Sequence, residues 1–325
     1  MNAIILAAGY ATRLRPLSYI RPKVLLPICG HPLLDILLRS LSGSGFNHVH
    51  INTHHLSGQI SSFLCQHDYA LEVKTYHEEE ILGTGGGIYR MIEEIPGTKT
   101  SVFIINGDIL AGIDPLVVWQ VHLKSRAAVT MVMIDLPEYN NVLVDRDFSI
   151  VGFGEKAKPL ADKNPELRFL AFTGMHVVNK DIVLRYSPNK KFFSIIETYE
   201  NAISAGEKVK AMFVPHITWQ EVGSVEGYVE AHKRLMRNSE EFAPWLTNVS
   251  FPSIHSTAAI HRSAKLEESV CIGRNSKVDA NTILKNVIIW DNVLVGKDIQ
   301  LEDTIVCDNC TVQESMKNEI LLPEM

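Results

Sequence analysis

Short apolar runs alternate with stretches in which apolar residues recur every three or four positions, from residue 1 to about residue 235. The short runs predict buried strands, and the amphipathic stretches predict helices between them. The expected strands are Ala3–Leu6, His48–Asn52, Ser101–Ile105 and Ala128–Ile134. The expected helices are Leu33–Ser44, Ser57–Gln66, Gly86–Ile95, Asp114–Ser125, Phe193–Ala205 and Ser224–Met236.

This alternation indicates an α/β fold class, a doubly wound, Rossmann-like domain with a largely parallel sheet. We expect the domain to span residues 1–237, followed by a linker at residues 238–253 that contains Pro244. In such a sheet, ligands bind at the edge formed by the carboxyl ends of the strands.

A different spacing begins at residue 254, where apolar residues recur every six positions. They are Ile254, Ile260, Leu266, Ile272, Val278 and Leu284, and after one skipped residue Ile289, Val295, Leu301 and Cys307. A period of six is typical of a parallel β-helix in which each turn has three short faces. Ordinary short antiparallel strands are the alternative. We expect residues 254–325 to form a short β-helix of about three turns, the minimum for a stable stack, and a C-terminal tail.

Composition excludes several classes of protein. The formal net charge of −6 argues against a nucleic-acid binder, which needs a basic surface. No apolar run is long enough to span a membrane, and no basic residue precedes the first apolar run as in a signal peptide. The odd number of five scattered cysteines indicates reduced thiols in a cytoplasmic protein. Cys307 and Cys310 fit wall positions of the β-helix better than half of a zinc site.

Candidate chemistry begins where the first expected strand ends. A glycine after a strand, here Gly9, allows a sharp turn that presents backbone N–H groups to a phosphate. Arg13 can hold phosphate oxygens through its planar guanidinium, and Lys23 offers a point charge. Taken alone, this pattern fits a solvated surface turn better than a phosphate site.

Several motifs in register resemble the sugar-1-phosphate nucleotidylyltransferases. Leu6–Leu17 and Pro22–Pro27 resemble the family signature, and Glu78–Gly86 resembles its base-binding turn. The remaining matching pieces are Asn106-Gly107-Asp108, Glu155-Lys156, Thr173-Gly174-Met175 and Trp219–Ser224. Many members of the family carry a left-handed hexapeptide-repeat β-helix behind this domain, as we expect here.

The resemblance implies a role for each matching residue. Arg13, Lys23 and Asp108 would be catalytic. The nucleotide would contact Leu6, Ala7, Ala8, Gly9, Arg13, Glu78, Gly83 and Thr84. The sugar phosphate would contact Asn141, Glu155, Lys156 and Gly174. Asp108 and Glu221 would hold Mg²⁺, which prefers oxygen ligands.

For base recognition, the carboxylate of Glu78 offers only acceptors, which suits the two adjacent donors of guanine and also the single donor of uracil. Close approach of the backbone to a flat ring would explain Gly83 and Gly85. A solvated charge cluster is the alternative for the Glu78–Glu80 run.

Three positions depart from the family pattern. Ala11 replaces a glycine, which costs stability only if its φ is positive. Glu221 replaces an aspartate among the metal ligands and is longer by one methylene. Asn141 stands where a glycine is common, and asparagine tolerates left-handed backbone better than most residues.

The substrates implied are a nucleoside triphosphate and a sugar 1-phosphate, with GTP and mannose 1-phosphate leading. Uridylyl or thymidylyl transfer to a glucose- or MurNAc-type phosphate is the alternative. A non-catalytic regulatory subunit is a third hypothesis, favoured by Ala11 and Glu221 but opposed by the other retained site residues.

Two histidine groups could indicate a metal site, and the β-helix could indicate acyl transfer, but we favour structural roles for both. His48, His50, His54 and His55 lack a convergent third ligand and fit ordinary strand and loop positions better than a metal site. His255 and His261 are available for acyl transfer, but three turns without a long inserted loop favour a scaffold. We expect a homo-oligomer formed through the exposed end of the β-helix.

Overall fold

The computed structural model describes residues 1–97, 100–242 and 253–324, which form two compact units. The first unit contains residues 1–9 and 37–219, and the second contains residues 10–36, 220–242 and 253–324. The expected division after residue 237 stays a prediction, since contacts alone do not tell which segments fold independently. Part of the expected linker, including Pro244, lies outside the described residues.

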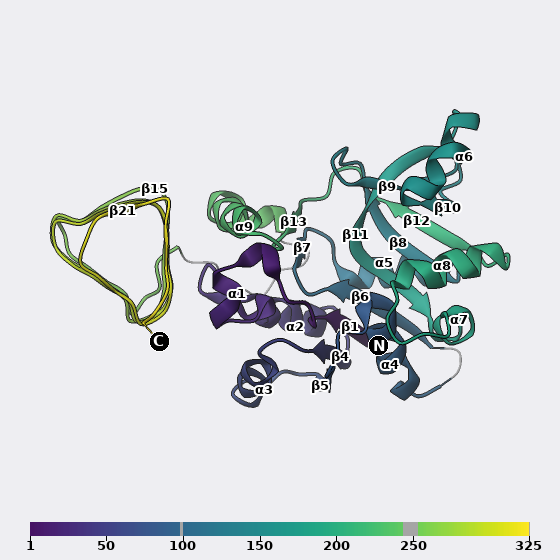
Figure 1. Cartoon of the computed structure of the whole chain (residues 1–325), viewed down its shortest axis with the longest axis horizontal. Helices are drawn as coiled ribbons and strands as arrows, with labels where there is room; N and C mark the ends of the chain where they lie inside the picture. Colours follow the sequence, from purple (N-terminus) through teal and green to yellow (C-terminus); the bar gives the residue numbers. More distant parts are fainter. Residues whose placement is uncertain (98–99, 243–252, 325) are drawn as a thin grey trace. The chain divides into compact units, whose positions relative to one another are not determined.

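A nine-stranded mixed sheet forms the centre of the first unit (Figure 1). Its strands are β1 (Asn2–Leu6), β4 (His48–Thr53), β5 (Glu72–His77), β6 (Ser101–Asn106), β8 (Val129–Ile134), β9 (Asn140–Val144), β10 (Ile150–Phe153), β11 (Arg168–Asn179) and β12 (Val209–Phe213). Along the sheet the order is β10-β9-β11-β6-β1-β4-β5, and β8 pairs with β11 and β12.

The helices follow the amphipathic stretches closely. They are α1 (Leu17–Ile20), α2 (Leu33–Gly43), α3 (Ser57–Cys65), α4 (Gly83–Glu94), α5 (Pro115–Ser125), α6 (Lys158–Lys163), α7 (Lys180–Tyr186), α8 (Ile195–Ser204) and α9 (Val225–Asn238). Side chains cap three of them, because Asp114, Ser194 and Ser224 each accept a hydrogen bond from an amide of the first turn. All four expected strands and all six expected helices are present, and α4 begins three residues earlier than expected.

The expectation of a largely parallel sheet is only partly right. Strands β5, β4, β1 and β6 run parallel, as do β8 and β12. Strand β11 runs antiparallel to β6, β8 and β9. The twelve-residue β11 has the near-continuous apolar run of any buried strand, so its direction depends on connections that the local pattern does not contain.

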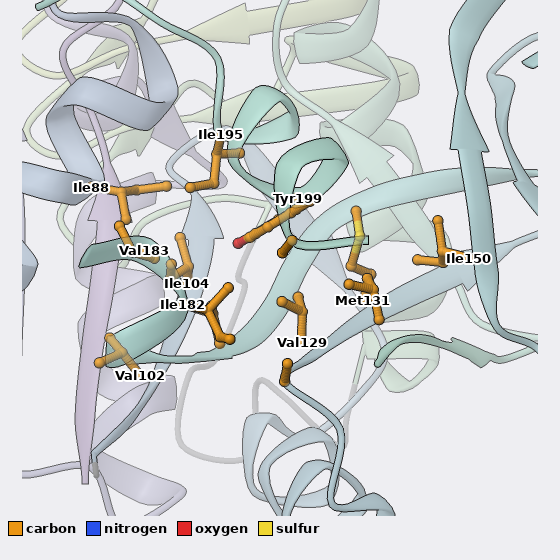
Figure 2. Close-up of a cluster of buried hydrophobic side chains, with 14 of the residues drawn as sticks. Ile88, Val102, Ile104, Val129, Met131, Ile150, Ile182, Val183, Ile195 and Tyr199 are labelled. Carbon is orange, nitrogen blue, oxygen red and sulfur yellow. The ribbon is translucent and has the colours of Figure 1, made fainter. Parts of the chain in front are cut away.

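One face of this sheet is covered by α4, α7 and α8 (Figure 2). Ile88 from α4, Ile182 from α7 and Tyr199 from α8 are fully or almost fully buried against the strands. On the opposite face, the ring of Phe46 lies 5.5 Å from Phe103 of β6 and 5.8 Å from Trp119 of α5. Both faces are therefore apolar, as a doubly wound fold requires.

The C-terminal part of the second unit consists mainly of parallel strands in two sheets, drawn end-on as a yellow triangle in Figure 1. The strands are β14 (Ala259–Ile260), β15 (Lys265–Ile272), β16 (Lys277–Val278), β17 (Ile283–Ile289), β18 (Leu294–Val295), β19 (Gln300–Val306), β20 (Thr311–Val312), β21 (Met316–Lys317) and β22 (Ile320–Leu321). Hydrogen bonds join residues 17 or 18 positions apart, so each turn of this coil has that length. The antiparallel alternative is wrong, because every strand pair of the coil is parallel.

Left-handed asparagine and aspartate residues turn the chain at the corners of the coil. They include Asn275, Asn281, Asn292, Asp298 and Asn309, all with φ between 54° and 60°. Short polar side chains tolerate this backbone because they bond locally. The Asn292 amide shows the pattern: it accepts from Asn275 (3.2 Å) and donates to Asn309 (3.3 Å), which links three successive turns.

The first turn of the coil departs from the expected inward pattern. Ile272, Val278 and the later expected positions are buried, but Ile254 and Leu266 are 36% and 37% exposed. Among the described residues, no turn of the coil stacks on that side of the first turn, which is consistent with the partial exposure of these two side chains.

The second unit also contains several short elements, and side-chain contacts join parts of this unit to the coil. The short elements are η1 (Thr12–Leu14), η2 (Lys23–Leu25), β2 (Pro27–Ile28), β3 (His31–Pro32) and η4 (Ser239–Phe242). The Arg21 guanidinium lies 4.7 Å from the ring centre of Trp290 and pairs with Asp308. The Tyr228 hydroxyl of α9 donates to the carbonyl of Pro27 (2.7 Å) and accepts from Trp290 Nε1 (2.9 Å).

Three short elements remain, η3 (Gly154–Ala157), β7 (Ile109–Ala111) and β13 (Trp219–Glu221). Across the residues described, no helix combines the length and the apolar character needed to cross a membrane.

Candidate active site

Three parallel strands bring candidate site residues to one edge of the sheet. Leu6 at the end of β1 is in register with Asn52 of β4 on one side and Asn106 of β6 on the other. The amide of Gly107 donates to the carbonyl of Leu6 (2.9 Å), which fixes the turn that follows β6. The glycine loop after β1 and the turn that carries Asp108 therefore start side by side, at the carboxyl edge that the sequence predicts.

The side chain of Asn52 connects this edge to the expected base-binding turn. Its Oδ1 accepts from the amide of Ala7 (2.8 Å), and its Nδ2 donates to Oε1 of Glu78 (2.8 Å). Oε2 of Glu78 accepts from the amide of Leu82 (2.9 Å), immediately before α4. A continuous polar chain thus runs from the glycine loop to the start of α4.

This series of hydrogen bonds gives each carboxylate oxygen of Glu78 a partner within the protein. The Glu78 side chain is buried, whereas Glu79 and Glu80 are exposed as in a solvated cluster. Contact between Glu78 and a base stays a prediction, while the structure shows that the residue holds Asn52 and the turn in place.

Packing within the protein accounts for the glycines of the turn, while the approach of a flat ring to them stays a prediction. A methyl group at Gly83 would lie 2.6 Å from the carbonyl oxygen of Phe193, and one at Gly85 would overlap the Phe193 ring. The Gly85 amide donates to that carbonyl (2.9 Å), and Oγ1 of Thr84 accepts from the amide of Ile195 (3.0 Å). The turn is therefore fixed to the segment before α8.

Asp108 lies in the two-residue turn between β6 and β7 and is 8% exposed. Gly174 in β11 faces the same strand end, since a methyl group there would lie 2.8 Å from Nδ2 of Asn106. The adjacent Thr173 carbonyl accepts from Nε1 of Trp219 (3.0 Å), whose ring lies 5.4 Å from that of Tyr139. The structure thus places Asp108 and Gly174 at neighbouring strands of one edge.

The basic candidates lie in the second unit. Arg13 of η1 forms an ion pair of 2.6 Å with Oε1 of Glu221, and Lys23 begins η2 directly after Pro22. The Arg13 side chain is 65% exposed and that of Glu221 is 21% exposed, so the guanidinium remains accessible to a ligand. Glu221 therefore positions Arg13 in addition to its expected role as a metal ligand.

Ala11 has φ of 50°, the left-handed conformation. The sequence predicts a stability cost under this condition, because the β-carbon crowds the carbonyl oxygen in left-handed backbone. Asn141 shows the opposite outcome, since it lies in β9 without a positive φ. Its tolerance of left-handed backbone is therefore not what this position requires.

The expected sugar-phosphate residues Glu155 and Lys156 form an exposed surface feature in η3. Glu155 pairs with Lys158 (2.7 Å), and Lys156 approaches Glu200 (3.4 Å). The side chains are 84% and 83% exposed, so both are accessible to a ligand but not held for one.

The histidine groups behave as ordinary structural residues. Nδ1 of His50 lies 2.9 Å from the Tyr76 hydroxyl, and burial lowers the pKa of His50. His48 pairs with Glu72, and Nδ1 of His54 donates to the carbonyl of Glu78 (2.7 Å). Among the described residues, none of these histidines joins a cluster with metal-ligand spacing. All five cysteines are free thiols, as expected, and Cys307 and Cys310 are buried in the coil.

Sequence reasoning missed Asn52 and Gly87 as site residues. A methyl group at Gly87 would lie 2.7 Å from both Nδ2 of Asn52 and Oε1 of Glu78, so this glycine makes room for their hydrogen bond. The one available signal was Asn52 standing at the end of an expected strand, level with Leu6.

Comparison with known proteins agrees with this geometry. The family model described as Nucleotidyl transferase matches residues 2–238, and that described as GMPPB C-terminal domain matches residues 250–320. The mannose-1-phosphate guanylyltransferase of Mycobacterium tuberculosis is 26% identical, with 93% of this chain and 83% of that protein covered. The UTP–glucose-1-phosphate uridylyltransferase of Synechocystis sp. is 23% identical, with 94% and 82% covered.

The crystal structure of HddC from Yersinia pseudotuberculosis has the same fold in the first part of the chain. Its TM-score is 0.57 at 23% identity, with 72% of this chain and 99% of that chain covered. Because the family match spans residues 2–238, this chain belongs to the nucleotidyl transferase family and is an enzyme of that kind.

Proposed function

We propose that this enzyme transfers a guanylyl group from GTP to mannose 1-phosphate, giving GDP-mannose and pyrophosphate. The observation that carries the reaction class is the register of Leu6, Asn52 and Asn106, which starts the glycine loop and the Asp108 turn side by side. The choice of substrates rests on the M. tuberculosis guanylyltransferase, which is similar along 93% of this chain.

In this reaction a phosphate oxygen of the sugar phosphate attacks the α-phosphorus of the nucleotide, and pyrophosphate leaves from the opposite side. Catalysis then depends mostly on positioning and on neutralising charge. Arg13, oriented by Glu221, and Lys23 are the residues proposed to neutralise the triphosphate. The Ala7 amide is engaged by Asn52, so the amides from Ala8 onward are the ones that would face phosphate oxygens.

We further propose Mg²⁺ as the divalent metal of the reaction, held by Asp108 and Glu221. Both residues offer carboxylate oxygens, the donor type that Mg²⁺ prefers. When bound, the ion would lower the negative charge on the phosphate groups. Arg13 already neutralises part of the charge on Glu221.

For the remaining site, we propose that Gly83 and Thr84 offer the nucleotide a turn held in place by Glu78. The sugar phosphate would contact Gly174 at the strand edge, with Asn141, Glu155 and Lys156 as exposed residues that order around it. Uridylyl transfer to glucose 1-phosphate is the second candidate, because the Synechocystis uridylyltransferase is similar along 94% of this chain.

The coil is proposed to be a left-handed β-helix of hexapeptide repeats. Its exposed first turn, with Ile254 and Leu266, supports a homo-oligomer through that end, and the five free thiols support a cytoplasmic location. Analytical ultracentrifugation of the purified chain tests the oligomer, which would have to be a dimer or larger.

The substrates are tested by measuring pyrophosphate release with Mg²⁺. GTP, UTP, dTTP, ATP and CTP are each combined with the 1-phosphates of mannose, glucose, GlcNAc and MurNAc. We expect the fastest turnover with GTP and mannose 1-phosphate. Faster turnover with UTP and glucose 1-phosphate would replace the first candidate by the second, and no release from any pair would contradict both.

A further inference from the structure

Three buried side chains in the second unit form a cluster that the transfer reaction does not use. Cys29 follows β2, His232 lies in α9, and Cys271 lies in β15 of the coil. The ligating atoms of the three all lie within 4.8 Å of one another. Their exposed fractions are between 1% and 3%, so the cluster is closed to bulk solvent.

The histidine of this cluster is oriented as a metal ligand would be. Its Nδ1 lies 3.0 Å from the carbonyl oxygen of Tyr228, which can only accept, so the ring proton is on Nδ1. The lone pair is then on Nε2, the other ring nitrogen. A backbone carbonyl that fixes the tautomer of a ligating histidine is a common arrangement around protein-bound metals.

The two sulfurs are suited to bind as a pair. Their sulfur atoms lie within 4.8 Å of each other and of the imidazole nitrogen, so one ion can contact all three ligands. Two thiolates and a neutral imidazole carry two negative charges, which a divalent ion balances fully and a monovalent ion balances in part.

We propose that Cys29, His232 and Cys271 bind a thiophilic metal ion, Zn²⁺ or Cu⁺. Two thiolates and an imidazole are the donor set that these ions prefer. Within the described part of the chain, the cluster contains no fourth histidine, cysteine or carboxylate. The bound ion joins the segment after β2, α9 and the coil, so it stabilises the unit that carries Arg13 and Lys23.

The test uses the full chain, purified under reducing conditions and loaded separately with Zn²⁺ and with Cu⁺. We expect one tightly held ion per chain, measured by mass spectrometry of the metal after removal of excess. Cys271→Ser and Cys29→Ser should lose it. Cys307→Ser is the matched control, because this cysteine is equally buried in the same coil and lies outside the cluster.

Two measurements on the unaltered chain keep the test independent of how the variants fold. X-ray absorption of the zinc-loaded chain should show two sulfurs at about 2.3 Å and one nitrogen at about 2.0 Å. Chelation should lower the melting temperature of the unaltered chain and of the control.

Failure to retain either ion overturns the proposal. So does loss of the ion in Cys307→Ser to the same extent as in Cys271→Ser. A Cys29–Cys271 disulfide in the purified chain, detected as a mass two units lower, also overturns it in favour of a redox link. None of these outcomes depends on the transfer reaction.

Discussion

At the scale of single residues, the structure shows which polar side chains of the candidate site are hydrogen-bonded to other parts of the protein. Asn52 accepts a hydrogen bond from the amide of Ala7 and donates one to Glu78. Glu78 accepts a second hydrogen bond from the amide of Leu82. Buried polar groups with full partners are costly to disturb, because each lost partner leaves a desolvated group. These two residues therefore hold the backbone at Ala7 and Leu82 in place.

Gly87→Ala tests this positioning network. The added methyl group lies 2.7 Å from both Asn52 and Glu78 and must push them apart. We expect a loss of about 1–3 kcal/mol in stability and a raised KM for the nucleotide. Thermal denaturation and initial rates measure the two effects. Gly58→Ala is the control, since its methyl group meets nothing within 4 Å in α3, and the account is contradicted if both variants behave alike.

Ala11→Gly tests the strain in the glycine loop. With φ of 50° at this position, glycine avoids the left-handed penalty of a β-carbon. After the greater flexibility of glycine in the unfolded chain is subtracted, we expect a gain of about 0.5–1 kcal/mol in the free energy of unfolding. Ala161→Gly in α6 should shift the melting temperature the opposite way. An Ala11→Gly variant less stable than the parent would refute the strain.

At the scale of elements, the sequence predicts strands and helices well where their periodicity is strong. The four expected strands and six expected helices are all present, with ends displaced by at most three residues. Strand β5 was missed because it lies at the edge of the sheet and most of its side chains are exposed, so it lacks an apolar run. The contact of Gly83 and Gly85 with Phe193 is not predicted, because Phe193 is distant from them in sequence.

Asn292→Ala tests how the coil turns its corners. The variant loses the hydrogen bonds to Asn275 and Asn309 and places alanine, which tolerates left-handed backbone less well than asparagine, at φ of 58°. We expect a destabilisation of about 1–2 kcal/mol, measured by thermal denaturation. Asn292→Gly also removes the hydrogen bonds, but glycine adopts left-handed backbone readily, so this variant should be destabilised less than Asn292→Ala. Equal losses in both variants would show that left-handed backbone is not what the corner requires.

At the scale of the whole molecule, the sequence predicts the parallel coil and a site at the carboxyl ends of the strands. It does not predict which segments of the chain form each compact unit. Residues 10–36 carry Arg13 and Lys23 and form one compact unit with the coil. The contacts responsible, such as Arg21 on Trp290, join residues far apart in the chain. No local periodicity encodes such pairs, so the sequence does not predict this grouping.

The buried His176 makes the stability of the fold depend on pH. Neither ring nitrogen has a hydrogen-bond partner within the described part of the chain, and burial lowers its pKa to about 3. In the unfolded chain the pKa is about 6.5. Between these values the unfolded state binds more protons, so stability falls as the pH drops from about 6.5 towards 3, by up to about 1.4 kcal/mol per unit.

His176→Phe should remove this part of the acid sensitivity, since phenylalanine does not titrate and fits among Phe172 and Tyr199. Urea denaturation at pH 7 and pH 5 measures it, and the unaltered chain should lose more stability between the two values than the variant. Equal losses would contradict a neutral, buried His176.

The central claim is that this chain is a transferase whose chemistry takes place at the strand edge carrying Asp108. The most direct measurement is the rate of pyrophosphate release from GTP and mannose 1-phosphate by the unaltered chain and by Asp108→Asn. We predict clear turnover by the unaltered chain and a loss of at least about a hundredfold in the variant at unchanged melting temperature. Asp162→Asn, an exposed change in α6, should keep full activity. Full activity in Asp108→Asn would contradict the account, because the reaction would then not depend on that site.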